Sequence, residues 1–294
     1  MKCNEIKNVP YCDLRIGVMF FFYEDPINYK QQIVELFHEY SNLIKEEFTS
    51  YRHNKDMGFN ILRRKSEIYF NGIIEKCDFE STQHLILTNA EKEKMQTIKF
   101  EMMLRNLKPE FPVKLPNYMY FEFLPTIDYT EVYHFIREAF WGIPYHYCCC
   151  NLLMGVNDYQ DNRGRQYAVK WARQKTCLSD YYSVFQNIFF HCELENKIDG
   201  PNMIQGLSRK LYDKIGLQKL IDECEDNNIY HELGEDYIII AISEEELPSN
   251  DNYFRQYQTL YHMLEDIILN MKKPQMYWKP EEWNQWRNRF NENA

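Results

Sequence analysis

Two stretches of the chain, one hundred residues apart, share a pattern that constrains the architecture more than any other feature. Residues 17–40, GVMFFFYEDPINYKQQIVELFHEY, begin with an apolar strand-like run and continue as an amphipathic helix. Residues 117–140, NYMYFEFLPTIDYTEVYHFIREAF, repeat that order without a gap. Each helix opens with capping-box spacing, Asn28 with Gln31 and Asp128 with Glu131. We therefore predict a duplicated strand–helix unit, forming two related lobes that share a sheet or pack back to back.

Both predicted helices carry an apolar face at helical spacing. The first face consists of Ile33, Leu36, Phe37, Tyr40 and Ile44, and the second of Val132, Phe135, Ile136 and Phe140. Four identical pairs accompany the shared pattern: Met19 with Met119, Phe21 with Phe121, Ile27 with Ile127 and Tyr29 with Tyr129.

The rest of the chain alternates strands and helices in irregular order, which is typical of an α+β fold. We predict strands at 84–89, 97–105 and 145–156, helices at 66–77 and 164–175, and a helical run over 200–224. A hairpin follows at 228–233 and 237–242 with its turn at 234–236, then a long helix capped by Asn250 or Asp251 and a short aromatic helix over 281–290. The prediction is one globular domain of mixed or antiparallel sheets with packed helices over residues 1–294, with possible sub-lobes at about 14–110 and 111–294.

Cysteine usage and hydropathy indicate the compartment. The nine cysteines are an odd number and include the adjacent trio Cys148, Cys149 and Cys150, which is unlike a disulfide framework. No secretory signal is visible, and the apolar run IGVMFFFY is too short to span a bilayer. We expect a cytoplasmic protein with reduced thiols and no membrane partner.

The charge of the chain is concentrated in one window. Residues 220–254 hold eleven Asp or Glu and no Lys or Arg, whereas the rest of the chain has 34 basic and 33 acidic residues. The net charge of −10 therefore comes from this window alone, and we expect no basic residue of the chain to offset it. A polyanion would be repelled there, which argues against nucleic acid as a direct ligand, and a basic protein would be attracted.

The predicted elements bring most of these carboxylates to one edge. Asp222, Glu223, Glu225 and Asp226 fall at the end of a helix, where the helix dipole disfavours anions, and Glu244, Glu245 and Glu246 leave the second hairpin strand. Hairpin pairing places residues 228 and 243 at the same end, so these seven carboxylates form one predicted docking edge. Glu235 and Asp236 at the turn are expected as outlying contacts roughly 15–20 Å away, and Tyr230 and Tyr237 as aromatic anchors. A solvated face that only maintains solubility is the alternative, and a calcium site lacks the spacing of an EF-hand.

Candidate chemistry elsewhere is sparse. His146, Cys148 and Cys150 alternate along a predicted strand and could begin a zinc site, although the sequence offers no identifiable fourth ligand. The run His191–Cys192–Glu193, the EKEK run at Glu91–Lys94 and the aromatic tail with Tyr277, Trp278, Trp283 and Trp286 are better explained by packing or surface charge. Motifs of zinc proteases, serine hydrolases, phosphate loops and dinucleotide folds are absent from the sequence. We predict no enzymatic activity and no cofactor.

The order of these segments resembles a known family. LRIGVMFFFYED, GPNMIQGLSRKLYDKIGLQKL, YIIIAI, PSNDNYFRQYQTLYHMLEDI and WNQWRNRF, within residues 14–290, are similar to the type VI secretion immunity proteins associated with VRR-Nuc type nuclease toxins. The segment SEEELPSND departs from the glycines that often follow the late strand in that family. The resemblance implies a cytoplasmic immunity protein whose partner is a cognate toxin with a basic surface. A metal-binding protein or enzyme centred on His146, Cys148 and Cys150, and immunity to a non-nuclease toxin through an aromatic surface, are the alternatives.

Overall fold

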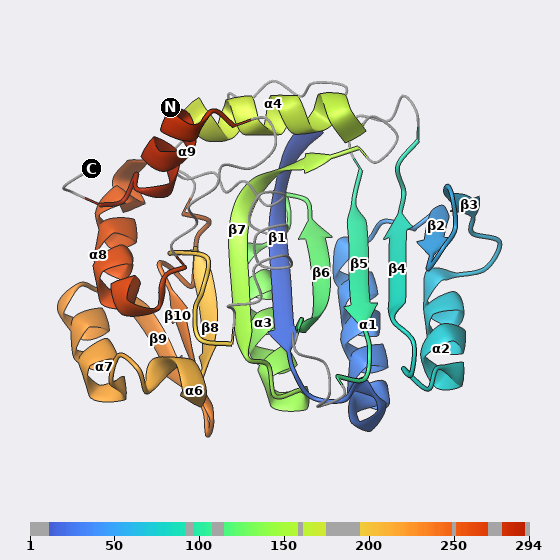
Figure 1. Ribbon diagram of the computed structural model, residues 1–294, viewed down its shortest axis with the longest axis horizontal. Coiled ribbons are helices and arrows are strands. Elements are labelled where there is room, and N and C mark those ends of the chain that lie inside the picture. The colour runs from blue at the N-terminus through green and yellow to red at the C-terminus, as the bar shows by residue number, and fades with distance from the viewer. Residues whose placement is uncertain are drawn as a thin grey trace.

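A single ten-stranded sheet organises the chain, with helices packed on it (Figure 1). The computed structural model describes residues 12–91, 97–107, 115–157, 161–174, 195–248, 251–269 and 278–291. Every strand pairing is antiparallel, in the order β3-β2-β4-β5-β6-β1-β7-β8-β10-β9. The strands are β1 (Cys12–Phe22), β2 (Ser50–His53), β3 (Asn60–Ile61), β4 (Gln83–Thr88), β5 (Lys99–Leu104), β6 (Asn117–Phe123), β7 (Tyr147–Val156), β8 (Ile204–Ser208), β9 (Tyr230–Leu233) and β10 (Tyr237–Ala241). The predicted α+β class is confirmed.

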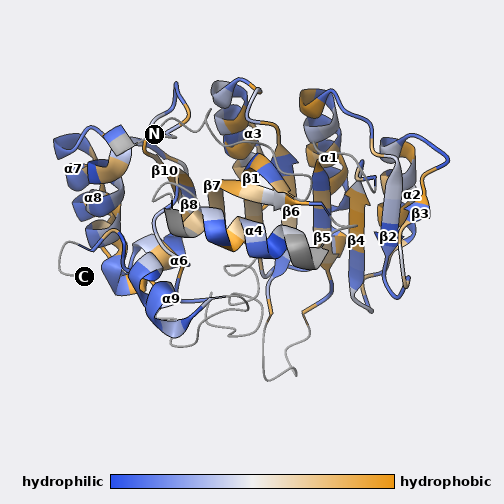
Figure 2. Ribbon diagram, turned by 90° about the horizontal axis from the view of Figure 1, so that it is seen from above, coloured by the Kyte–Doolittle hydropathy of each residue, from blue (hydrophilic) through white to orange (hydrophobic). Residues whose placement is uncertain are grey.

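Helices pack on one face of this sheet and at its ends (Figure 1). The helices are α1 (Lys30–Ile44), α2 (Ser66–Lys76), α3 (Tyr129–Gly142), α4 (Asp161–Gln174), α6 (Arg209–Tyr212), α7 (Leu217–Asp226), α8 (Phe254–Leu264) and α9 (Pro280–Arg287), with 3-10 turns η2 (Pro26–Tyr29), η4 (Asp251–Tyr253) and η5 (Glu265–Ile267). Helices α1, α2 and α3 lie on one face, and α4 lies across the ends of β1 and β7 (Figures 1 and 2). None of the helices in the described ranges combines the length and apolar character needed to cross a bilayer.

The two predicted strand–helix units lie side by side at the centre of the sheet. Strand β1 pairs with β6 so that Met19 faces Tyr120 and Phe20 faces Met119. At the offset of one hundred these two pairs exchange with each other, as they would if a two-fold axis related the strands. The remaining strands of the first unit lie beyond β6, and those of the second lie beyond β1. The two units therefore interlock within one sheet.

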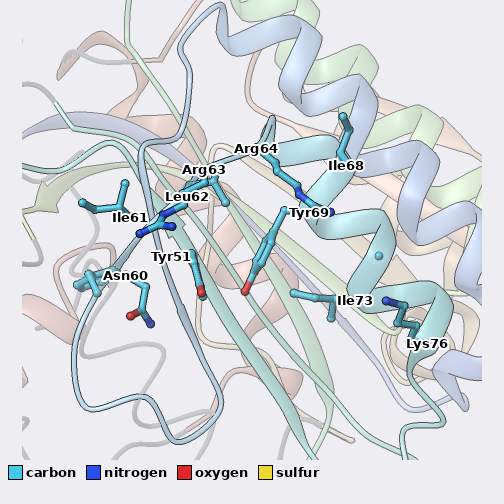
Figure 3. Close-up of a pocket in the computed structure, with 12 residues that line it drawn as sticks. Tyr51, Asn60, Ile61, Leu62, Arg63, Arg64, Ile68, Tyr69, Ile73 and Lys76 are labelled. Atoms are coloured by element: carbon cyan, nitrogen blue, oxygen red, sulfur yellow. The ribbon is translucent and has the colours of Figure 1, made fainter.

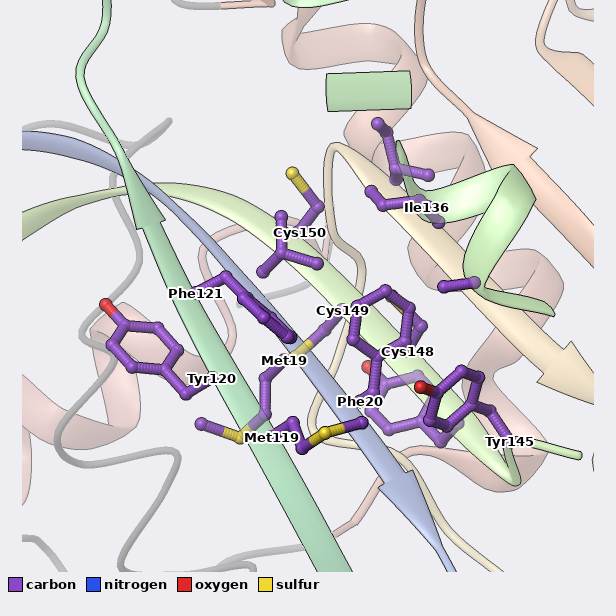
Figure 4. Close-up of a cluster of buried hydrophobic side chains, with 14 of the residues drawn as sticks. Met19, Phe20, Met119, Tyr120, Phe121, Ile136, Tyr145, Cys148, Cys149 and Cys150 are labelled. Carbon is purple, nitrogen blue, oxygen red and sulfur yellow. The ribbon is translucent and has the colours of Figure 1, made fainter. Parts of the chain in front are cut away.

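Aromatic side chains fill the core between this centre and the helices α1 and α3. Phe121 from β6 packs edge-on against Phe20 from β1, Phe135 from α3 and Tyr40 from α1, with ring centroids 5.0–5.9 Å apart. Both predicted apolar faces are buried. Cys148 of β7 lies opposite Phe20 and faces this core, as does Cys150. Cys149 lies opposite Met19 and faces the other side of the sheet (Figure 4). Burial thus accounts for the apolar composition of both stretches.

The caps of α1 and α3 differ in how well the sequence predicted them. Asp128 caps α3 as expected, accepting a hydrogen bond from the Thr130 amide at 3.0 Å. The capping box at Asn28 and Gln31 is wrong, because Asp25 accepts from the Ile27 amide at 3.1 Å and opens a 3-10 turn before α1. Pro26 follows Asp25 and fixes the backbone for that earlier start.

The helical run predicted over residues 200–224 is also wrong in its first part. Residues 204–208 form β8, which pairs with β7 and β10. Gly206 permits this insertion, since a Cβ atom there would lie 2.1 Å from Cζ of Phe140. The helical part is then divided at Gly216, whose positive φ of 98° separates α6 from α7. Tertiary pairing therefore overrides the helical pattern.

The C-terminal aromatic helix packs as a small core of its own. Trp278, Trp283 and Trp286 contact one another at ring-centroid distances of 5.2–5.5 Å, which confirms the packed tail. The guanidinium of Arg287 donates a hydrogen bond to the backbone oxygen of Asp199 at 2.5 Å and fixes α9 to the segment before β8. The predicted long last helix is shorter than expected, since α8 begins at Phe254 and ends at Leu264.

Candidate docking surfaces

The predicted hairpin holds the acidic edge. Tyr230 of β9 faces Ala241 of β10, and this register sets position 228 opposite position 243, as predicted. The end of α7 and the segment after β10 therefore reach the same end of the hairpin. We call this surface, made of Asp222, Glu223, Glu225, Asp226, Glu244, Glu245 and Glu246, the acidic edge. Its side chains are exposed, apart from the half-buried Glu244.

The residues that contact the acidic edge within the chain are polar but carry no charge. The side-chain amide of Gln218 donates to Asp222 at 2.8 Å, and the Tyr253 hydroxyl donates to Glu246. The hydroxyl of Ser243 accepts from the Glu245 amide at 3.3 Å and the Glu246 amide at 3.2 Å. Within the ranges that the structure describes, no ion pair involves any of the seven carboxylates. Their mutual repulsion therefore lacks a cationic partner in this part of the chain.

The turn of the hairpin differs from the edge and corrects one prediction. Asp236 forms an ion pair with Arg209 at 3.1 Å, so the expectation that nothing in the chain offsets the acidic window is wrong there. The same guanidinium donates to the backbone oxygen of Glu235 at 2.7 Å. Arg209 lies outside the acidic window in sequence and reaches the turn because β8 pairs with β10. Glu235 and Asp236 remain exposed and belong to this turn rather than to the acidic edge.

The two predicted anchor tyrosines support the hairpin from the α3 side. The Tyr230 ring lies edge-on to Tyr133 at 5.4 Å, and the Tyr237 ring tilts against Phe140 at 4.8 Å. Both are half-buried. Burial raises the pKa of Tyr237 above its ordinary value, so the residue is a neutral phenol at physiological pH. Their role as partner anchors stays a prediction.

A groove of about 720 Å³ opens beside the hairpin turn, and the sequence did not indicate it. Trp141 at the end of α3 contributes an indole that is 63% exposed, with the Arg137 guanidinium 5.4 Å from its ring centroid. Tyr237 and Tyr29 also line this groove, which we call the Trp141 groove. An exposed tryptophan beside a charged turn is the kind of side chain that anchors protein interfaces. In the sequence, only the tryptophan of the stretch AFWGIP could have indicated this groove.

A second groove, of about 780 Å³, lies at the opposite edge of the sheet between α2 and the β2–β3 segment (Figure 3). Tyr51 and Tyr69 pack against each other there, with ring centroids 4.5 Å apart. Ile61 is 77% exposed and Ile68 is 57% exposed. Three exposed cations complete its lining: Arg63, Arg64 and Lys76. We call this the α2 groove and these three residues its cationic rim.

The possible metal site at His146, Cys148 and Cys150 gains no support from the geometry. The Nδ1 atom of His146 lies 3.1 Å from the Ser208 hydroxyl, and the ring packs on Tyr23 at 5.2 Å. Burial raises the pKa of the Cys148 and Cys150 thiols well above the ordinary value, which disfavours the thiolate that binds metal. Among the described residues, no group of three or more His, Cys, Asp or Glu side chains could hold a metal ion. The run His191–Cys192–Glu193 and residues 92–94 of the EKEK run lie outside the described residues.

Comparison with known proteins identifies the fold and not the family. No family profile matches the chain, and no curated protein matches it in sequence. Among solved structures, it is similar to the Pseudomonas aeruginosa T6SS protein PA0821, a protein of the type VI secretion system. The TM-score is 0.75 at 12% sequence identity, over 95% of this chain and 82% of that one. The two chains therefore share the arrangement of strands and helices.

Proposed function

We propose that this protein is a non-catalytic immunity protein that binds and neutralises a cognate antibacterial type VI secretion toxin of the nuclease class. The observation that carries the proposal is the acidic edge, seven carboxylates gathered at one end of a hairpin without an ion pair in the described part of the chain. The family resemblance of the sequence supports the toxin–immunity relationship. The fold shared with a type VI secretion protein is consistent with it.

The mechanism follows from charge. Nucleases bind the polyanionic nucleic acid in a basic groove, and a cluster of carboxylates is complementary to such a groove. Exposed carboxylates attract that surface over several ångströms and speed the encounter, which an inhibitor of a toxin requires. Once docked, the acidic edge occupies the position of the phosphate backbone, and the nucleic acid is excluded. The immunity protein needs no reaction of its own for this.

Charge reversal at the acidic edge tests the proposal. The candidate partner is the toxin encoded next to this protein, and the variant is Glu244→Lys, Glu245→Lys and Glu246→Lys together. We expect the association rate at low salt to fall by about tenfold or more and cell protection to be lost. The matched control reverses Glu35, Glu47 and Glu75, three exposed carboxylates on the α1–α2 side of the molecule. Equal binding by the triple variant and the wild type would remove the acidic edge from the mechanism.

The Trp141 groove favours a second candidate, immunity to a non-nuclease toxin through an aromatic surface. Its exposed indole and the neighbouring Tyr237 offer an anchor that does not depend on charge. Under this candidate Trp141→Ala weakens toxin binding by about 2 kcal/mol or more, and affinity changes little with salt. Under the nuclease proposal the rate of association falls steeply as salt rises. A salt titration of the wild-type complex therefore separates the two.

A further inference from the structure

Among the residues that the structure describes, none fills the α2 groove. Two large aliphatic side chains, Ile61 and Ile68, face solvent there, and Met57 on the β2–β3 connection is fully exposed. Apolar side chains gathered at one exposed site are typical of interaction surfaces. None of the ion pairs between described residues includes Arg63, Arg64 or Lys76. The groove is therefore suited to a protrusion with an apolar tip and acidic flanks.

The same chain carries such a protrusion at the other edge of its sheet. Leu233 ends the edge strand β9 and is 49% exposed. Glu235 and Asp236 follow at the turn and are exposed, whereas Glu232 before Leu233 is half-buried and accepts a hydrogen bond from the Tyr133 hydroxyl at 2.9 Å. Arg209 offsets Asp236 alone, so the protrusion stays acidic. The apolar tip is complementary to the α2 groove, and the negative charge is complementary to its cationic rim.

The two surfaces cannot meet within one molecule. Strands β9 and β3 are the outermost strands of the ten, and nine spacings of about 4.8 Å separate them by roughly 43 Å. Figure 1 shows α2 and α7 at opposite ends of the sheet. Any contact between them must join two molecules.

We propose that the α2 groove of one molecule receives Leu233 from a second copy of this chain, with Glu235 at the hairpin turn facing the cationic rim. The contact joins two different surfaces and is therefore heterologous, so each added copy leaves one groove and one hairpin open at the ends. Assemblies grow with protein concentration and shrink as salt screens the attraction. The proposal does not depend on the toxin, because it concerns the protein alone.

Sedimentation of the purified full chain at low salt tests this. We expect a mean mass above the 35.9 kDa of one chain, rising with concentration and returning to one chain at high salt. A groove variant, Arg63→Glu with Arg64→Glu, and a hairpin variant, Leu233→Asp with Glu235→Lys, are each expected to sediment as single chains. The control Lys170→Glu with Lys279→Glu makes the same charge change as the groove variant, at exposed sites on α4 and before α9, and it should assemble like the wild type.

Mixing distinguishes this interface from any other. The groove variant keeps an intact hairpin and the hairpin variant keeps an intact groove, so an equal mixture should form a dimer and stop. That dimer also shows that both variants fold. A wild-type protein that stays a single chain at every concentration at low salt would overturn the proposal, whether or not the groove variant loses toxin binding. So would a wild type that assembles while the mixture stays monomeric.

Discussion

The two edges of the sheet differ in charge. At the β9 edge, eleven carboxylates fall within residues 220–254, and within the described ranges a single ion pair, to Arg209, offsets them. At the β3 edge, residues 50–76 hold six Lys or Arg against three Asp or Glu, around a groove with exposed isoleucines. A net charge of −10 thus describes neither edge. Charge in this protein is therefore separated along the sheet.

The largest expected effect comes from glycines at the two sides of the sheet. Gly206→Ala in β8 places a Cβ atom 2.1 Å from the Phe140 ring and should destabilise the protein by about 1–3 kcal/mol. Gly72→Ala in α2 meets no atom within 4 Å and should stabilise by about 0.5–1 kcal/mol. Urea denaturation measures both. If both substitutions changed the free energy of unfolding in the same direction, Gly206 and Gly72 would not differ in the space around them as described.

Glu39 on α1 is a half-buried carboxylate, in contrast to the mostly exposed acidic edge. Burial, and then the charge of Glu138, raise the pKa of Glu39 on α1 to about 7 from 4.5. The folded state then holds a proton that the unfolded state releases, so the contribution of Glu39 to stability is largest below pH 4.5 and is lost as pH rises through 7.

Glu39→Gln should therefore stabilise the protein at pH 8 by about 1 kcal/mol or less, since Glu39 is half-buried and solvent screens the charge. The gain should vanish near pH 5. Melting curves at the two pH values measure it. A gain that is equal at both pH values would assign it to packing rather than to charge.

Smaller effects are expected at the acidic edge itself. Glu223→Gln and Glu225→Gln remove negative charge from the last turn of α7, where the helix dipole is also negative. Each should stabilise by about 0.3–1 kcal/mol at low salt, and the gain should fade as salt rises. Denaturation at two salt concentrations measures this. Arg63→Gln, at the cationic rim, serves as the control and should not show the same gain.

The smallest effect is expected at the α2 groove. Ile68→Gln exchanges a side chain that is 57% exposed, so stability should stay within about 0.5 kcal/mol of the wild type. Self-association should nevertheless weaken. A large loss of stability would show that Ile68 supports the fold instead of a partner.

Sequence patterns predicted those parts of the fold that depend on local periodicity. The long strands β1, β6 and β7 and the helices α1 and α3 carry their period in consecutive residues, and all of them are present. Strands β2 and β3, four and two residues long, are too short to show a period and were not predicted. Residues 204–208 were assigned to a helix because only the pairing with β7 and β10 makes them a strand.

The same distinction applies to the surfaces. The register of the hairpin brings the acidic residues before β9 and after β10 to the same end. The local sequence specifies this register through the turn at Gly234. The ion pair of Asp236 with Arg209 and the two grooves each join segments that are distant in sequence. No local pattern encodes such contacts, so they became visible only in three dimensions.

The central position of β1 has a consequence for how the chain is made. Ten of its eleven residues are buried, and its two neighbours in the sheet begin at residues 117 and 147. Since a polypeptide leaves the ribosome from its N-terminus, this apolar strand emerges long before either neighbour exists. The nascent chain must therefore keep β1 from aggregating until β6, which begins at residue 117, has been translated.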